Sequence, residues 1–139
     1  MSSFEKPDQP SHYQGLAVYR AATLLYVCTE RVVKKFSRYH MYMLGDELRR
    51  HALQAPILVM RANRRATRAV AMEELCLGAE TMKIMINLSK EVDAFASFSA
   101  YTELAKLVME LARQAEAWRR FSEQSRSGSP KSALQRGPE

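Results

Sequence analysis

Apolar residues recur at steps of three and four along four stretches of the chain, and short polar breaks separate the stretches. This spacing places the apolar residues on one face of an α-helix, so each stretch predicts an amphipathic helix. The predicted helices span about residues 16–35, 40–66, 68–90 and 100–122. Because the breaks are short, neighbouring helices should run antiparallel, and the pattern predicts an all-α, up-down-up-down four-helix bundle.

Each predicted helix carries one continuous apolar stripe, and the four stripes together form the expected core. Its largest members are Leu25, Leu48, Val59, Leu75, Met82, Leu104, Leu111 and Trp118. Cys28 and Cys76 fall on the same stripes, which predicts two buried thiols and no disulfide framework. Pro56 lies inside the second helix and should kink it without ending it, because the stripe continues in phase. Thr67 and Ser99 are the expected N-caps of the third and fourth helices.

The two ends of the chain lack helical periodicity. Residues 1–14 predict a flexible N-terminal arm, and residues 123–139, which are rich in Ser, Gly and Pro, predict a disordered tail. The bundle is therefore expected over residues 15–122. No apolar run approaches the roughly 20 residues of a membrane span, and the N-terminus lacks the basic start and apolar stretch of a secretory signal. We expect a cytoplasmic protein of bacterial type with no membrane partner.

Composition and motifs limit the chemistry. The 139 residues, 47% apolar and 26% charged, suit one globular domain that is too short for a Rossmann or barrel enzyme. The sequence holds no Gly-rich phosphate loop, Cys-x-x-Cys, nucleophile elbow or Glu-x-x-His motif. His40 and His51 would stand roughly 16 Å apart on one helix, and Glu47 with His51 offers at most half a metal site. We expect no enzymatic activity, no cofactor and no metal.

The second and third predicted helices also carry apolar residues on their outer faces. These outer-stripe residues are Tyr42, Leu53, Ile57 and Met60 on the second helix, and Val70, Leu77, Ile84 and Leu88 on the third. Scattered apolar residues are normal on a surface, but two aligned stripes make a patch of the kind that marks interfaces. The pattern favours self-association, and a ring suits it because each subunit can offer one face to each neighbour.

The net charge of +6 is spread unevenly. Residues 31–68 hold ten basic and two acidic residues, hence +8, whereas residues 69–118 hold four basic and eight acidic residues, hence −4. The candidate nucleic-acid-binding residues are Lys34, Lys35, Arg38, Arg50, Arg61, Arg64, Arg65 and Arg68. Arginine suits bidentate phosphate contacts, so the segment predicts a surface for DNA or RNA backbone. The alternative is an ordinary solvated face. With no recognition helix or stacking platform evident, we expect no sequence-specific readout.

Several short motifs carry a resemblance to a known family. They are Lys35-Phe36-Ser37-Arg38, Tyr42 with Leu44-Gly45, Ala62-Asn63, and the series Tyr101, Leu104, Leu107, Glu110 and Trp118. Together, over residues 18–121, they resemble the small bacterial four-helix bundle protein family. That family includes proteins encoded in ribosomal-RNA intervening sequences and the accessory variability determinant proteins of diversity-generating retroelements.

The resemblance implies a homopentameric ring of four-helix bundles with a basic surface. In the retroelement branch it also implies binding to nucleic acid and to a partner reverse transcriptase. By position, the implied basic residues are Lys35, Arg38 and the arginines near Asn63.

Two functions compete. The leading hypothesis is a non-enzymatic, oligomeric adaptor that binds nucleic acid through its basic surface. The alternative is a structural or protein-interaction scaffold whose basic face meets an acidic protein. Salt dependence separates them, because phosphate binding weakens log-linearly with salt, by roughly one unit of slope per contact.

Overall fold

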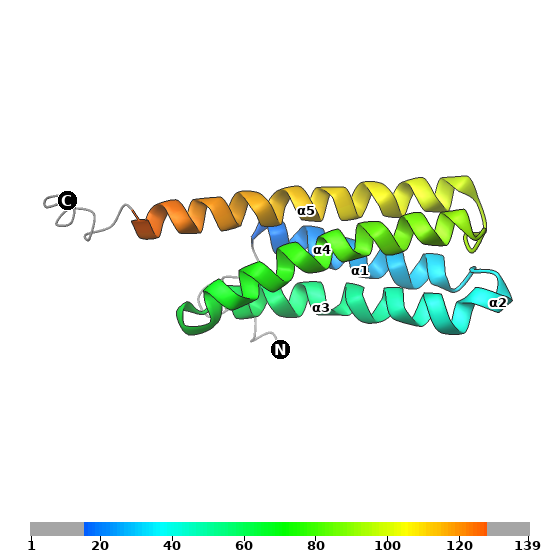
Figure 1. The fold of residues 1–139 in the computed structure, drawn as a ribbon, viewed down its shortest axis with the longest axis horizontal. Coiled ribbons are helices and arrows are strands. Elements are labelled where there is room, and N and C mark those ends of the chain that lie inside the picture. The colour runs from blue at the N-terminus through cyan, green and yellow to red at the C-terminus, as the bar shows by residue number, and fades with distance from the viewer. Residues whose placement is uncertain (1–15, 128–139) are drawn as a thin grey trace, which may run out of the picture.

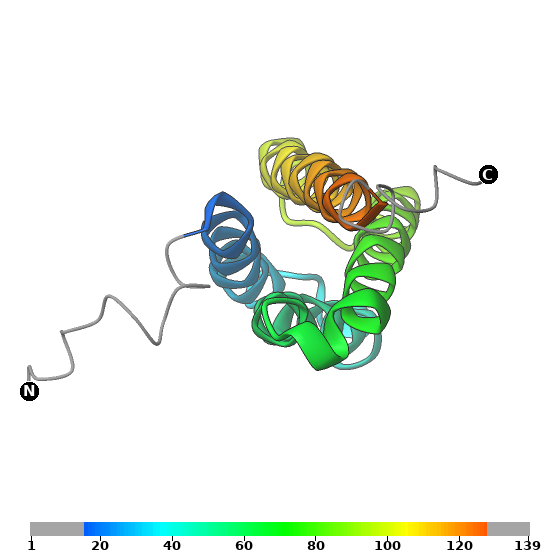
Figure 2. The same ribbon diagram turned by 90° about the vertical axis from the view of Figure 1, so that its left-hand side faces the viewer.

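The computed structural model describes residues 16–127, and every regular element in that range is helical. Four long helices, α1 (Ala17–Val33), α3 (Asp46–Ala62), α4 (Arg68–Glu91) and α5 (Phe98–Ser127), lie side by side (Figure 1). A short helix α2 (Arg38–His40) and a π-helical turn (Met41–Gly45) precede α3, and a 3-10 turn (Arg65–Thr67) precedes α4. Helices α1 and α4 each pack against both α3 and α5, so the four enclose one core (Figure 2). The prediction of an all-α helical bundle is confirmed.

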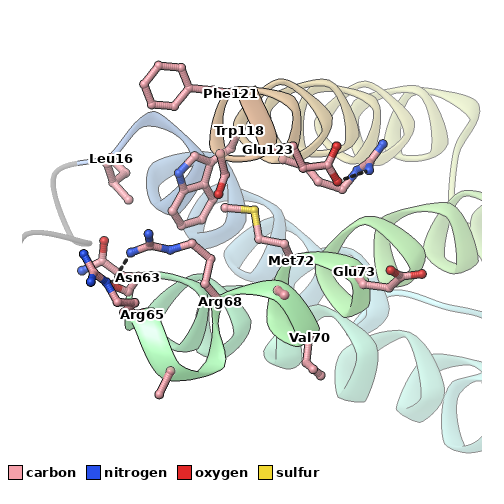
Figure 3. Close-up of a pocket in the computed structure, with 14 residues that line it drawn as sticks. Leu16, Asn63, Arg65, Arg68, Val70, Met72, Glu73, Trp118, Phe121 and Glu123 are labelled. Carbon is pink, nitrogen blue, oxygen red and sulfur yellow. Dashed lines mark hydrogen bonds and ion pairs between the residues drawn. The ribbon is translucent and has the colours of Figure 1, made fainter. Parts of the chain in front are cut away.

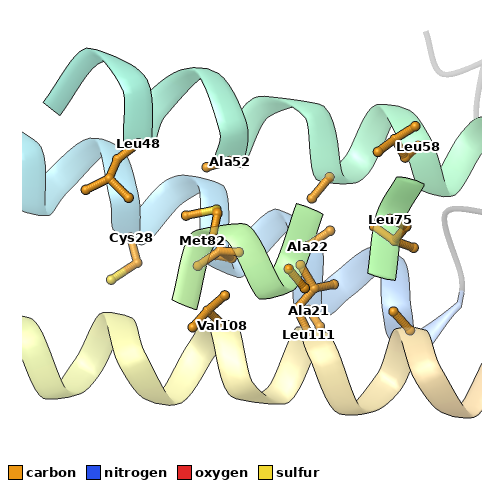
Figure 4. Packing of buried hydrophobic residues seen from close by; sticks show 14 of the residues in the cluster. Ala21, Ala22, Cys28, Leu48, Ala52, Leu58, Leu75, Met82, Val108 and Leu111 are labelled. Atoms are coloured by element: carbon orange, nitrogen blue, oxygen red, sulfur yellow. The ribbon is translucent and has the colours of Figure 1, made fainter. Parts of the chain in front are cut away.

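The predicted stripes form that core. Seven of the eight large residues expected there, all but Trp118, are at most 2% exposed. Figure 4 shows Leu48, Met82 and Val108 reaching the same interior from three different helices. Trp118 is half-buried and packs at the edge of the core. Cys28 is buried as predicted. The prediction for Cys76 is wrong, because this residue lies at the side of the apolar stripe of α4 and stays partly exposed.

The second predicted helix differs most from the observed one, because a π-helical turn replaces its first residues. Gly45 ends this turn and packs closely against the end of α1. A Cβ atom at this position would lie 2.7 Å from Cγ1 of Val33, a distance that real Cβ atoms do not tolerate without a shift. Helix α3 then continues through Pro56 to Ala62 without a break. Residues 63–66, also predicted as helix, form the turn into α4 together with Thr67.

The ends of α4 and α5 have well-defined caps. Helix α4 ends in a Schellman motif, in which the Ala94 N–H donates to the Ser89 carbonyl (2.9 Å) and the Asp93 N–H to the Lys90 carbonyl (3.0 Å). Asp93 takes the left-handed conformation that this motif requires, with φ 58°. Helix α5 begins earlier than predicted, so Ser97 and not Ser99 caps it, its Oγ accepting from the Ala100 N–H (3.1 Å).

Helix α5 also continues past its predicted end. Residues 123–127, predicted as tail, are its last residues, while the predicted arm and the rest of the tail lie outside the described range. Within residues 16–127, no helix has the length and apolarity needed to cross a bilayer.

One end of the bundle is closed by aromatic side chains, and the other end is open. At one end, Phe36 and Phe95 pack edge to face with ring centroids 5.1 Å apart, and Phe95 contacts Tyr101 at 5.7 Å. The Ser37 N–H donates to the Ala94 carbonyl (2.9 Å), which ties the α1–α2 turn to the α4–α5 loop. At the other end, where the α3–α4 turn lies, a cleft of about 800 Å³ opens between α4 and α5.

Candidate nucleic-acid interface

The predicted basic residues fall into two groups at opposite ends of the bundle (Figure 1). The α1–α2 cluster consists of Lys34, Lys35 and Arg38, and the α3–α4 cluster consists of Arg61, Arg64 and Arg65. Helix α3 separates them by its 17 residues, or roughly 25 Å. Arg50 lies on α3, nearer the first cluster. Residues that share one charged segment of the sequence therefore do not share one surface patch.

Arg68, the eighth predicted residue, differs from its neighbours because its guanidinium is bonded to the backbone. Its Nε–H donates to the Ala62 carbonyl (2.8 Å), and Nη2–H donates to the Asn63 carbonyl (3.1 Å). These carbonyls lie at the C-terminal end of α3, where a cation is stabilised by the helix dipole. The Thr67 hydroxyl adds a bond to the Arg61 carbonyl (2.6 Å) in place of the cap predicted for it. Arg68 and Thr67 together hold the turn in shape.

The α3–α4 cluster consists of three exposed arginines, Arg61 in the last turn of α3 and Arg64 and Arg65 on the fixed turn that follows. Among the described residues, none of their side chains forms a hydrogen bond or ion pair. The first turn of α4 contains no acidic residue that would neutralise them. Three arginines within five residues of one another, none of them paired with a carboxylate of the described residues, create a local positive potential that attracts anions.

The α1–α2 cluster is also exposed, but it lies close to carboxylates. Arg49 pairs with Glu30 on α1 (3.0 Å) and with Asp46 (3.3 Å), and Arg50 pairs with Glu47 (3.5 Å). Hydrogen bonds from the Tyr26 hydroxyl and from Arg49 hold the pKa of the Glu30 carboxyl below its ordinary value, and the charge of Lys34 contributes. Lys34, Lys35 and Arg38 form no ion pair with a described residue, and the nearby Glu30 carboxylate offsets part of their positive potential.

Ion pairs between helices use two further basic residues of the +8 segment. Arg31 on α1 grips Glu103 on α5 with two bonds of 3.2 and 3.1 Å, and this lowers the pKa of the Glu103 carboxyl. Arg49 joins α3 to α1 in the same manner. Neither arginine was among the predicted binding residues, and both are engaged in stabilising the bundle.

The cleft at the open end adjoins the α3–α4 cluster, and sequence reasoning missed it. Its apolar wall is formed by Leu16, Val70, Met72, Trp118 and Phe121, and its charged lining by Arg65, Arg68, Glu73, Arg119 and Glu123. Figure 3 shows Trp118 extending from α5 toward Arg68 and Met72 of α4. Arg119 pairs with Glu116 and, at 2.9 Å, with Glu123, so its charge is compensated. The apolar stripe correctly placed Trp118 on the inner face of α5. It could not show that the last turns of α5 stand apart from α4 and leave a cleft beside Trp118.

The outer-stripe residues form the candidate self-association surface. Six are exposed, namely Tyr42, Leu53, Val70, Leu77, Ile84 and Leu88, while Ile57 and Met60 are half-buried. The four members on α4 are each at least 55% exposed, and they form an apolar strip along this helix, at spacings of seven, seven and four residues, with acidic residues such as Glu73 and Glu80 between its members. Leu24 and Val27 are also exposed, on α1, diagonally across the bundle from α4 (Figure 2).

Comparison with known proteins finds no match to this chain among protein-family models, curated proteins or solved structures. The resemblance to the four-helix bundle protein family therefore remains an expectation that rests on the short motifs.

Proposed function

We propose that this chain is a non-enzymatic, oligomeric protein that binds the phosphate backbone of DNA or RNA through the α3–α4 cluster. The observation that carries the proposal is the exposure of Arg61, Arg64 and Arg65 at the end of α3 and on the fixed turn after it, without carboxylate partners among the described residues. Because the turn backbone is already fixed, binding would need to order only the arginine side chains, whose planar guanidinium groups match phosphate oxygens. Lys34, Lys35, Arg38 and Arg50 add a second, weaker positive area, and Arg68 positions the turn.

The bundle is proposed to be antiparallel and to form the subunit of a ring-like homo-oligomer. Apolar residues are exposed on α4 and, diagonally opposite, on α1, so one subunit can present different faces to two neighbours. Such head-to-tail contacts close into rings when the rotation permits. A ring would repeat the α3–α4 cluster once per subunit and strengthen its field. The family resemblance favours five subunits and, for the retroelement branch, a reverse transcriptase as partner.

The alternative is a scaffold that binds an acidic protein partner. The exposed apolar strip on α4 favours this reading, because a protein surface could cover it. The same arginines would then pair with carboxylates, which also accept bidentate contacts.

Fluorescence anisotropy with labelled oligonucleotides tests the proposed function. At low salt the wild type should bind unrelated DNA and RNA sequences of equal length with similar affinity, since phosphate contacts carry no sequence information. The variant Arg61→Gln/Arg64→Gln/Arg65→Gln should bind at least about tenfold more weakly, because three phosphate contacts are lost. The matched control Lys34→Gln/Lys35→Gln/Arg38→Gln removes the same charge from the other end and should lose less. No binding by the wild type would contradict the proposal and leave the scaffold reading.

A further inference from the structure

We propose that the cleft between α4 and α5 receives one unstacked nucleotide of a nucleic-acid strand, with the base against Trp118 and its phosphate on Arg65. This inference rests on the proposed function and adds a preference for single strands to it. A duplex could still bind the arginines through its phosphates, but its stacked bases could not enter the cleft.

The position of the cleft connects it to the proposed phosphate surface. Arg65 belongs to the α3–α4 cluster and also lines the cleft, so a strand bound along the cluster passes the entrance. The cleft volume of about 800 Å³ lies in the range of small-molecule sites, which is roughly 300–1,000 Å³.

Trp118 gives the cleft an aromatic surface of the kind that binds bases. Its indole is half-buried and lines the cleft beside Met72 and Leu16. Within the described part of the chain, the indole N–H donates to no acceptor, so it can donate to a ligand oxygen. Bases stack on aromatic side chains largely irrespective of sequence, because each base has a π-face. The sequence alone showed no such platform, and the structure supplies a candidate.

The charged lining suits a ligand that is anionic at one end and flat at the other. Arg65 forms no ion pair with a described residue, whereas Glu123 is neutralised by Arg119. Arg68 uses two of its five N–H donors on α3 carbonyls, which fixes the guanidinium and leaves three donors available. A fixed guanidinium beside an indole can donate to the edge of a base while the indole contacts its face. Glu73 is exposed at the rim.

The chain contains one tryptophan, so its intrinsic fluorescence reports on this cleft directly. In the free protein, acrylamide should quench the Trp118 emission. Titration with a short oligothymidylate should change the emission and protect it from acrylamide. A blunt, GC-rich duplex of equal length should bind at low salt without either effect. Emission that acrylamide cannot reach in the free protein would show the cleft to be filled already and would overturn the inference.

The variant Trp118→Leu separates base stacking from phosphate binding. Loss of one stacked base should weaken single-strand affinity by about tenfold, as measured by anisotropy, and leave duplex affinity nearly unchanged. Phe98→Leu, which removes an exposed aromatic ring at the opposite end of the bundle, is the matched control and should change neither. Circular dichroism checks that both variants fold, and the wild-type fluorescence titration does not depend on any variant.

The possible failures can be told apart. If single strand and duplex bind equally and the wild-type emission is unchanged by either, the nucleotide site is wrong while the proposed phosphate binding stands. If neither nucleic acid binds, the proposed function has failed, and this inference fails with it. A free mononucleotide that changes the emission as the oligothymidylate does would show that the cleft recognises the nucleotide unit without neighbouring phosphates.

Discussion

Arginine side chains have three different roles in this small bundle. Arg31 and Arg49 join helices through carboxylates, Arg68 caps the end of α3, and the α3–α4 cluster lacks partners among the described residues. The role of each arginine depends on what lies within reach. Glu103, the partner of Arg31, is 72 residues away in the sequence. The count of charges along the chain therefore shows an excess of positive charge, but it does not show which of these charges are unpaired on the folded surface.

The Tyr26–Glu30–Arg49 contact makes a prediction about pH. The Tyr26 hydroxyl donates to Glu30 Oε2 (2.6 Å) and Arg49 to Oε1 (3.0 Å), which lowers the pKa of Glu30 from its ordinary value of 4.5. A lowered pKa in the folded state adds stability above the ordinary value and loses it as pH falls through the folded value. Glu30→Gln should therefore melt below the wild type near pH 7.

The melting difference between wild type and Glu30→Gln should shrink as pH falls below about 4.5 and vanish once Glu30 is protonated in the folded wild type. Thermal melts followed by circular dichroism across this range measure it. Glu73→Gln is the control, because this exposed carboxylate forms no ion pair with a described residue. A Glu30→Gln difference that is independent of pH would contradict the assignment.

At the scale of elements, the buried stripes predict which substitutions lower the stability of the bundle. Leu48 on α3 is fully buried, so Leu48→Ala should lower the free energy of unfolding by about 2–5 kcal/mol through lost burial and a cavity. Met109→Ala, at a position 59% exposed on α5, should cost about 1 kcal/mol or less. Chemical denaturation measures both, and equal losses would mean that Leu48 does not lie in the core.

The periodicity of apolar residues predicted the helices, but it did not predict the local geometry at their ends. The stripes through Leu25, Leu48, Leu75 and Leu104 predicted the core because a 3.6-residue period has few alternatives over twenty residues. The π-helical turn before α3 could not be predicted, since it depends on how closely Gly45 meets Val33. Capping by Ser97 was missed for a similar reason, because several serines near a helix start fit the same pattern.

The candidate site was predictable only in part. Excess positive charge between residues 31 and 68 is visible in the sequence, and so is the clustering of Arg61, Arg64 and Arg65. The separation of the two clusters by the length of α3 is a property of the fold, as is the engagement of Arg68. The cleft was invisible, because it arises where the first turns of α4 and the last turns of α5 leave space between them.

At the scale of the whole molecule, the exposed strip on α4 predicts self-association. Ile57→Glu/Leu77→Glu would place charges in an apolar contact, which is costly, so this variant should sediment as smaller species with its helical content retained. Met109→Glu makes the same chemical change outside the outer stripes and should leave assembly intact. A wild type that is monomeric at micromolar concentration would contradict the oligomeric part of the proposal.

The two ends of the bundle differ in charge and in packing. Aromatic rings close the end that carries the α1–α2 cluster, where the Glu30 carboxylate offsets part of the charge of Lys34. The opposite end combines the α3–α4 cluster, whose arginines form no ion pair with the described residues, with the cleft beside Trp118. The proposed nucleic-acid surface therefore lies at one end of the bundle, and the proposed ring would bring several such ends together.

The salt dependence of binding tests this assignment most directly. For the wild type, log affinity should fall linearly with log salt, with a slope of roughly 0.7–0.9 per phosphate contacted. The Arg61→Gln/Arg64→Gln/Arg65→Gln variant should flatten that slope by about 2–3 units, and the Lys34→Gln/Lys35→Gln/Arg38→Gln variant by clearly less. Slopes that are identical in the wild type and both variants, or a wild type that binds no nucleic acid at low salt, would contradict phosphate recognition at the α3–α4 turn.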